Sequence, residues 1–220
     1  MHRIATGALV ALALMGPAGA VAQEADAREL YYQRADPGLD EEDKWLGVRT
    51  SILLASSDRR RAQLRVREVS DQESFRSGDR FRLAVQANVA GHLYAFVLDS
   101  GGDIHLLFPY ERGAKTNTVR PFRTRQVPEE DWFRFDEETG AERFYLFLSR
   151  RPIGELERAA GEDERFRAGE LEDLLEDAGD NEWKLFDEPD AAGETLRTYY
   201  VEQPETRRSY LVRVFDLEHR

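Results

Sequence analysis

The sequence predicts a mainly β protein, an antiparallel β-sandwich that carries an acidic helical insertion and is α+β overall. Apolar and polar residues alternate with a period of two through most of residues 46–152. Turn-forming residues recur roughly every eight to twelve positions, the spacing of short strands in sandwiches. Helical spacing then replaces the period of two and gives way to it again near residue 194. We expect the last strands to join the main sandwich, because each needs a sheet edge with which to pair.

Residues 1–22 have the pattern of a secretory signal peptide. A basic start at Arg3 precedes an apolar run, and Ala20-Val21-Ala22 supplies the small-x-small cleavage pattern. We expect cleavage between Ala22 and Gln23. The run from Ile4 to Met15 is shorter than the roughly 20 residues that span a bilayer, which disfavours an uncleaved anchor. The chain is therefore expected to be exported to a bacterial periplasm, with secretion to the medium as the alternative.

From residue 23 to Pro109 the sequence predicts an arm followed by a series of strands. Residues 23–44 are polar and acidic and are predicted to form a flexible arm, whereas 45–220 are predicted to form a single β-rich domain. Strands with one apolar face are expected at 48–54, 64–69 and 81–87. Leu93–Leu98 is apolar on both faces, which predicts a central strand. A strand at 104–108 follows a hairpin loop and ends at Pro109.

The second half alternates between loop, helix and strand. A long loop is predicted from Tyr110 to Asp131, followed by strands at 132–135 and 144–148. The acidic helical insertion spans 153–182, with helices expected at 154–160 and 168–178. Residues 154–182 hold 12 acids and 3 arginines, a net charge of −9 that is most of the −12 of the whole chain. The final strands are expected within 194–218.

Composition excludes several classes of function. A net charge of −12 argues against non-specific binding to nucleic acids, which requires a positive surface. No segment after residue 22 could span a membrane. The chain has no cysteine, so disulfides, thiolate nucleophiles, cysteine-ligated zinc and iron–sulfur clusters are excluded. We expect no cofactor.

The sequence contains no strong catalytic constellation. Motifs that present a nucleophilic serine or a zinc-binding pair of histidines are absent. The best candidate for a metal or acid–base site is a polar cluster of His92, Asp103 and His105, because the strands that carry the two histidines are predicted to pair. Two surface histidines on adjacent strands are the simpler interpretation. The protein is therefore not expected to be an enzyme.

Aromatic and basic side chains gather in and beside the predicted loop 110–131. Loops are where binding residues concentrate, so a partner surface is expected here. The alternative, which we favour for the rings, is that the loop folds back and buries them. The candidate binding surface consists of Tyr110, Arg120, Phe122, Arg123 and Trp132.

An ordered set of motifs resembles a known family. The set comprises Ser77-Gly78-Asp79, Gln86-Ala87-Asn88, Gly91-His92-Leu93-Tyr94 and Leu106-Leu107-Phe108-Pro109. Over about residues 46–152 it resembles the bacterial domain of unknown function 4384 family. It departs from the family at His92, where an aromatic residue is usual, and at Tyr110, where asparagine is frequent. The resemblance implies a β-rich, exported or envelope-associated module with no agreed catalytic residues.

Together these observations predict an exported, non-catalytic interaction or accessory module of the cell envelope. Its partner is expected to be a protein or another envelope component. The alternative is a periplasmic domain that binds a glycan or a cell-wall fragment. A hydrolase with an unrecognised site is the third hypothesis.

Overall fold

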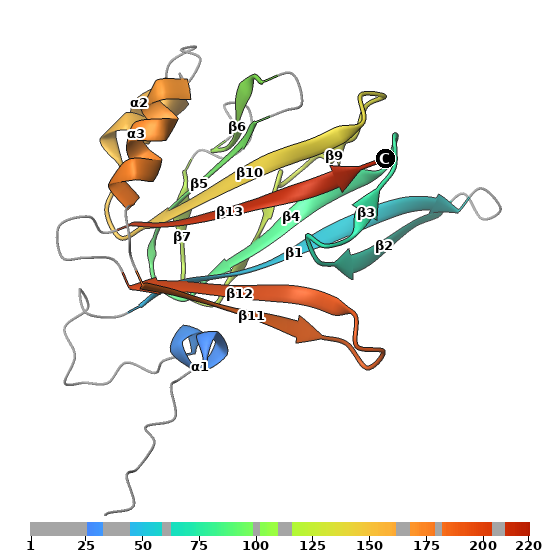
Figure 1. The fold of residues 1–220 in the computed structure, drawn as a ribbon, viewed down its shortest axis with the longest axis horizontal. Coiled ribbons are helices and arrows are strands. Elements are labelled where there is room, and N and C mark those ends of the chain that lie inside the picture. The colour runs from blue at the N-terminus through green and yellow to red at the C-terminus, as the bar shows by residue number, and fades with distance from the viewer. Residues whose placement is uncertain are drawn as a thin grey trace, which may run out of the picture.

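The computed structural model describes residues 26–32, 45–58, 63–98, 102–109, 116–161, 168–178, 182–203 and 210–220. Two β-sheets form a sandwich, with helices outside both sheets (Figure 1). The predicted mainly β, antiparallel fold is therefore confirmed. The predicted signal peptide, Ala22 and Gln23 lie outside the described residues.

Sheet A has seven strands, all in antiparallel pairs. Its order is β11-β12-β1-β4-β8, with β2 also paired to β1 and β9 to β4. The first strand is much longer than the sequence indicated, because it pairs with β12 along one part and β2 along another. The strands are β1 (Leu46–Asp58), β2 (Gln63–Val69), β4 (Arg80–Ala87), β8 (Thr124–Val127), β9 (Phe133–Arg134), β11 (Glu182–Pro189) and β12 (Thr195–Gln203).

Sheet B has six strands in the order β3-β13-β10-β5-β6, with β7 also paired to β5. Only the short β3 runs parallel to its neighbour, and it covers just the end of β13. Of the last strands, β12 pairs with β1 in sheet A and β13 pairs with β10 in sheet B, as expected from their need for a sheet edge. The strands are β3 (Ser74–Phe75), β5 (Gly91–Leu98), β6 (Ile104–Phe108), β7 (Thr118–Val119), β10 (Gly140–Ser149) and β13 (Tyr210–His219).

The main core lies between the sheets and consists of alternate residues from each strand. On β4 these are Phe81, Leu83 and Val85, which pack toward residues such as Leu146 of β10. β5 and β10 are apolar on their outer faces too, because two helices cover sheet B (Figure 1). These helices are α2 (Gly154–Gly161) and α3 (Ala168–Ala178), as the helical spacing predicted.

A short helix covers part of the outer face of sheet A. This helix, α1 (Ala27–Tyr31), is capped by Asp26, whose carboxylate accepts from the backbone N–H of Glu29. Tyr31 is fully buried, and its hydroxyl donates to the backbone oxygen of Gln86 at 3.0 Å. This segment was expected to be part of a flexible arm at 23–44. The structure corrects that expectation, because tertiary packing stabilises a helix too short to form alone.

Two further expectations are corrected. The predicted loop 110–131 contains the strands β7 and β8, which are short and largely polar and so leave little periodic signal. β11 follows α3, where no strand was expected before residue 194. None of the helices in the described part of the chain has the length and apolar character needed to cross a membrane.

Candidate functional site

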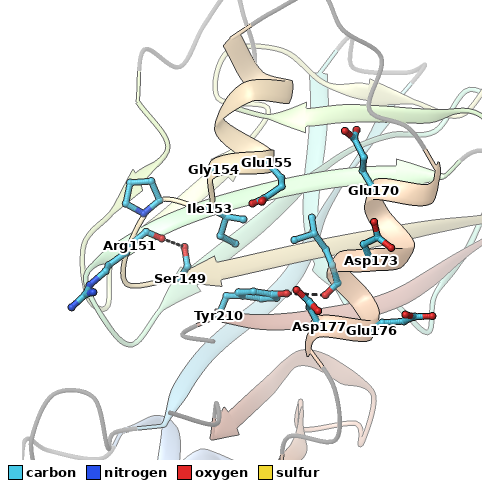
Figure 2. Close-up of a pocket in the computed structure, with 12 residues that line it drawn as sticks. Ser149, Arg151, Ile153, Gly154, Glu155, Glu170, Asp173, Glu176, Asp177 and Tyr210 are labelled. Atoms are coloured by element: carbon cyan, nitrogen blue, oxygen red, sulfur yellow. Dashed lines mark hydrogen bonds between the residues drawn. The ribbon is translucent and has the colours of Figure 1, made fainter. Parts of the chain in front are cut away.

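A cleft of about 680 Å³ lies beside the start of α2. Figure 2 shows Glu155 of α2 on one side and Glu170 and Asp173 of α3 on the other. The ends of β10 and β13 supply Ser149 and Tyr210. The described residues that line it are Ser149, Arg151, Pro152, Ile153, Gly154, Glu155, Glu170, Asp173, Leu174, Glu176, Asp177 and Tyr210.

This acidic cleft has the charge to attract cations. Its polar floor groups bond to the backbone: Ser149 donates to the oxygen of Arg151 at 2.6 Å, and Tyr210 donates to the oxygen of Leu174 at 2.9 Å (Figure 2). Ser149 is buried, and no histidine lines the cleft to activate it. Across the described residues, no three His, Asp or Glu side chains are grouped to hold a metal ion.

A polar network fastens α2 to sheet B. Tyr94, which is fully buried, donates to Glu157 Oε1 at 2.5 Å and accepts from the backbone N–H of Ile153 at 3.1 Å. Asn117 donates to the same Glu157 oxygen at 2.7 Å. His92 Nδ1 lies 3.1 Å from Asn117 Oδ1, which can only accept, so Nδ1 carries the proton. Burial and the bond to Glu157 raise the pKa of Tyr94.

The structure does not bring His92 and His105 together. Their strands, β5 and β6, do pair, but His105 lies opposite Val97, whereas His92 lies opposite Thr118 of β7. His92 and Val97 are five positions apart on β5, which is about 17 Å along a strand. Asp103 precedes β6, at the His105 end. The expected cluster of His92, Asp103 and His105 is therefore not formed. The register of the strands separates the two histidines, and the sequence alone does not specify that register.

The candidate loop surface is assembled only in part. Arg120, Phe122 and Arg123 share one exposed turn between β7 and β8, closed by a hydrogen bond from the N–H of Arg123 to the oxygen of Arg120. Trp132 lies apart from this turn, beneath the guanidinium of Arg82, 4.3 Å from the ring centroid. Tyr110 lies outside the described residues.

Phe122 occupies a backbone conformation that is unusual for its type. Its φ is 57°, the left-handed region that normally favours glycine or asparagine. Its N–H donates to the oxygen of Ala87 at 2.8 Å, and its own oxygen accepts from Gln86 Nε2 at 3.1 Å. These bonds fix the turn, and the ring is still 45 % exposed.

The Phe122 ring forms a surface with α1. It stacks on Tyr32, with ring centroids 5.9 Å apart and planes 13° apart, and Tyr32 is 42 % exposed. The Tyr31 ring contacts both rings edge-on, and Tyr199 contacts Tyr32 at a tilt. We name Arg120, Phe122, Arg123 and Tyr32 the aromatic ledge. The rings of the predicted loop were expected to be buried; Trp132 and Phe133 are partly buried, whereas Phe122 is exposed.

A second polar pair, Ser77 and His219, was not predicted from the sequence. Ser77 Oγ lies 3.1 Å from Nε2 of His219, and the buried His219 ring packs on Phe135. A histidine that acts as base for a serine needs an acceptor at its other nitrogen. Nδ1 of His219 is buried and has no such acceptor among the described residues. The arrangement therefore suits Nε2 donating to Ser77, which is a structural role.

The motifs shared with the family have structural roles here. Gly78, with a φ of 85°, makes the turn before β4, and its N–H donates to Phe135. Tyr94 and Asn117 belong to the network above. The sequence model of a protein family described as Domain of unknown function (DUF4384) matches residues 74–152.

Residues 74–152 are thus similar to the DUF4384 family.

The DUF4384 match begins at β3 and ends just before α2, so it is shorter than the resemblance over about 46–152 suggested. Much of both sheets lies outside it, including β1, β12 and β13. The acidic cleft lies across the boundary, since only Ser149, Arg151 and Pro152 of its lining are within the match. No curated protein and no solved structure matches the chain.

Proposed function

We propose that the chain is an exported, non-catalytic interaction module of the bacterial cell envelope and that the aromatic ledge contacts a protein partner. The observation that carries this proposal is the backbone of Phe122. A bulky residue at positive φ costs on the order of 1–3 kcal/mol, and such strain concentrates at functional sites. Burial does not explain the choice of residue, because nearly half of the ring is exposed.

The composition of the ledge supports a protein as partner. Aromatic residues and arginine are enriched in protein interfaces and among the residues that contribute most to binding. Phe122 and Tyr32 are held in place by stacking, and Arg120 and Arg123 flank them. A ledge that is already ordered has little conformational entropy left to lose on binding.

The use of the polar groups supports a non-catalytic role. In the acidic cleft, Ser149 donates a hydrogen bond to a backbone oxygen. Ser77 lies beside His219, but among the described residues no acceptor at Nδ1 orients the His219 ring as a base would require. The network of Tyr94, Glu157 and Asn117 connects a helix to a sheet. Each group is engaged in holding the fold.

Export is supported by the leader pattern of residues 1–22 and is tested directly. The full chain, tagged at its C-terminus, is expressed in a Gram-negative host that is then fractionated. We expect the product in the periplasmic fraction with Gln23 at its N-terminus. A cytoplasmic product that retains Met1 would refute the proposed location.

The ledge is tested with Phe122→Gly. Glycine adopts a positive φ freely, so the relief of strain should offset the lost ring contacts and leave stability within about 1 kcal/mol of the parent. Partners captured from envelope extract are identified, purified and titrated against both proteins. We expect Phe122→Gly to weaken binding at least tenfold, and Val66→Ala, which alters an equally exposed residue on β2, to leave it unchanged.

Two outcomes would overturn the assignment. Equal affinity of the parent and Phe122→Gly for the purified partner would remove the ledge from the interface. A melting temperature raised by soluble peptidoglycan fragments in the parent but not in Phe122→Gly would make the ligand a glycan rather than a protein.

A further inference from the structure

β11 is an outer strand of sheet A. It pairs with β12 from Glu182 to Pro189, and within the described residues no strand pairs with its other side. Figure 1 shows it at the margin of the sheet, beyond β12. An unpaired edge presents a row of backbone N–H and C=O groups that can accept another strand.

The side chains of β11 suit a strand with neighbours on both sides. Trp183 and Leu185 are 59 % and 48 % exposed, and they share the face that Glu202 and Tyr200 present on β12. Phe186 faces the other way and packs on Tyr199. Apolar residues on both faces are typical of interior strands, although β11 also carries charged residues of the kind that protect edge strands.

Sheet B does not reach far enough to cover these residues. Glu202 accepts from the backbone N–H of Val212 at 3.3 Å, which places β13 over β12. Trp183 lies one strand further out, where it stacks on Tyr200 with centroids 5.9 Å apart. The apolar strip of Trp183 and Leu185 therefore lies beside an open hydrogen-bonding edge.

We propose that this edge binds a second copy of the chain, with the two β11 strands antiparallel about a two-fold axis. A two-fold axis brings the same patch together from both copies, so the patch must complement itself. The charges on β11 decide whether it can. Like charges directly opposite each other destabilise a strand pair, and opposite charges stabilise it.

Among the registers that pair more than half of β11, one satisfies this requirement. An axis at Lys184 or Asp187 places that residue opposite its own copy, and an axis at Leu185 places Glu182 opposite Glu188. An axis at Phe186 places Lys184 opposite Glu188 of the second copy, twice, and the two Phe186 rings opposite each other. This register pairs Trp183–Pro189 with the same residues of the second copy, and no like charges are opposed within that stretch.

The first test is the mass of the purified chain in solution, measured by sedimentation at several concentrations. We expect a reversible dimer, with Leu185→Glu raising its dissociation constant at least tenfold, because the new carboxylate lies opposite Asp187 of the second copy, twice. Val66→Glu, at a residue 50 % exposed on β2, should leave the constant unchanged. A chain that stays monomeric at every concentration, or a dimer unaffected by Leu185→Glu, would overturn the proposal.

The second test reports the register. The chain has no cysteine, so a single introduced cysteine can form disulfides only between copies. Phe186→Cys should be trapped as a covalent dimer by mild oxidation, because residues opposite each other have Cβ atoms about 5 Å apart. Trp183→Cys, although more exposed, should remain monomeric, since the proposed register places its own copy six positions away. The reverse result would exclude this register.

Discussion

Among single residues, Gly91 shows how the structure changes the meaning of a sequence motif. Its position between two strands suggested a turn that needs glycine. A Cβ atom built on Gly91 would lie 2.1 Å from the backbone oxygen of Ser149, on the adjacent β10. Glycine is therefore required by the close approach of two backbones, at the point where the DUF4384 motif enters β5.

Gly91→Ala is expected to lower the free energy of unfolding by more than about 2 kcal/mol, because the backbone oxygen cannot move aside without breaking the pairing of β5 with β10. Gly169→Ala is the matched control: nothing lies within 4 Å of its Cβ, and alanine favours the helix by up to about 1 kcal/mol. Urea denaturation measures both. Equal stability of Gly91→Ala and the parent would show that the strands are further apart.

The buried ion pair of Arg213 and Asp71 offers a second test. Arg213 is only 3 % exposed, and burial lowers its pKa. Asp71→Asn should destabilise the fold by about 3–5 kcal/mol, because it leaves the guanidinium buried without its counter-charge. Asp216→Asn, which breaks an exposed pair with Arg143, should cost no more than about 1 kcal/mol. Chemical denaturation distinguishes the two, and similar losses would contradict the argument.

Glu68 makes stability depend on pH. Burial alone would raise its pKa, but hydrogen bonds from Arg197, at 2.6 and 2.9 Å, and from Ser51, at 2.6 Å, outweigh burial and lower it. A carboxyl whose pKa is lower in the folded state stabilises the fold above its ordinary pKa of 4.5. That stabilisation is lost as the pH falls from about 4.5 through the folded pKa.

Glu68→Gln should therefore be less stable than the parent at pH 7, and the difference should shrink as the pH falls below about 4.5. Denaturation midpoints from pH 7 to pH 3 measure it. Comparing the two proteins at each pH separates the contribution of Glu68 from the pH dependence that both proteins share. A difference that is constant across this range would show that its pKa is not lowered.

For the elements, predictability from sequence follows the strength of the periodic signal. Strands with one apolar face, such as β4 with Phe81, Leu83 and Val85, were located correctly. β11 was missed because Trp183 and Phe186 lie on opposite faces, so neither a period of two nor of 3.6 stands out. α1 was missed because only its contacts in the folded state make it helical.

The candidate site was predictable to a smaller extent, for two physical reasons. The pairing of β5 with β6 was foreseen, but register depends on side-chain packing across the sheet, so the distance between His92 and His105 was not. Arg120, Phe122 and Arg123 were singled out correctly as neighbours on one loop. The exposure of Phe122 depends on a positive φ that its residue type does not suggest.

The docking of α1 depends on one hydroxyl group. Tyr31→Phe removes the hydrogen bonds to the backbone oxygen and Oε1 of Gln86 and leaves the ring in place. We expect a loss of about 0.5–1.5 kcal/mol and faster amide exchange in α1. Tyr32→Phe, which removes a longer 3.3 Å contact with Tyr199, should change both less. Exchange in α1 that is unaffected by Tyr31→Phe would show that the ring alone holds the helix.

At the scale of the whole molecule, the DUF4384 match does not coincide with a complete fold. It contains β4 and β10, but their neighbours β1 and β13 lie outside it. Both sheets are therefore interrupted if residues 74–152 are isolated. The strands beyond the match supply about a third of the buried residues of the core between the sheets.

Residues 74–152 expressed alone should not fold cooperatively, because β4 and β10 would each lose the neighbouring strand on one side, β1 and β13, and would leave unpaired edges. Residues 45–220 should fold as the full chain does. Amide chemical-shift dispersion and thermal denaturation distinguish the two. A sharp unfolding transition for 74–152 would show that the matched segment is an independent unit.

The pairing of β1 with β12 also sets the order of events in folding. Leu46 lies opposite Glu202, 156 positions further along the chain, and β10 likewise waits for β13. Contacts so distant in sequence form slowly, because the loop between them must close before they stabilise anything. A chain emerging from the ribosome would therefore keep its apolar faces uncovered until the final strands are made. Any protein that binds the chain during its synthesis therefore meets it before the sandwich has formed, because the sandwich closes only after the last strands are made.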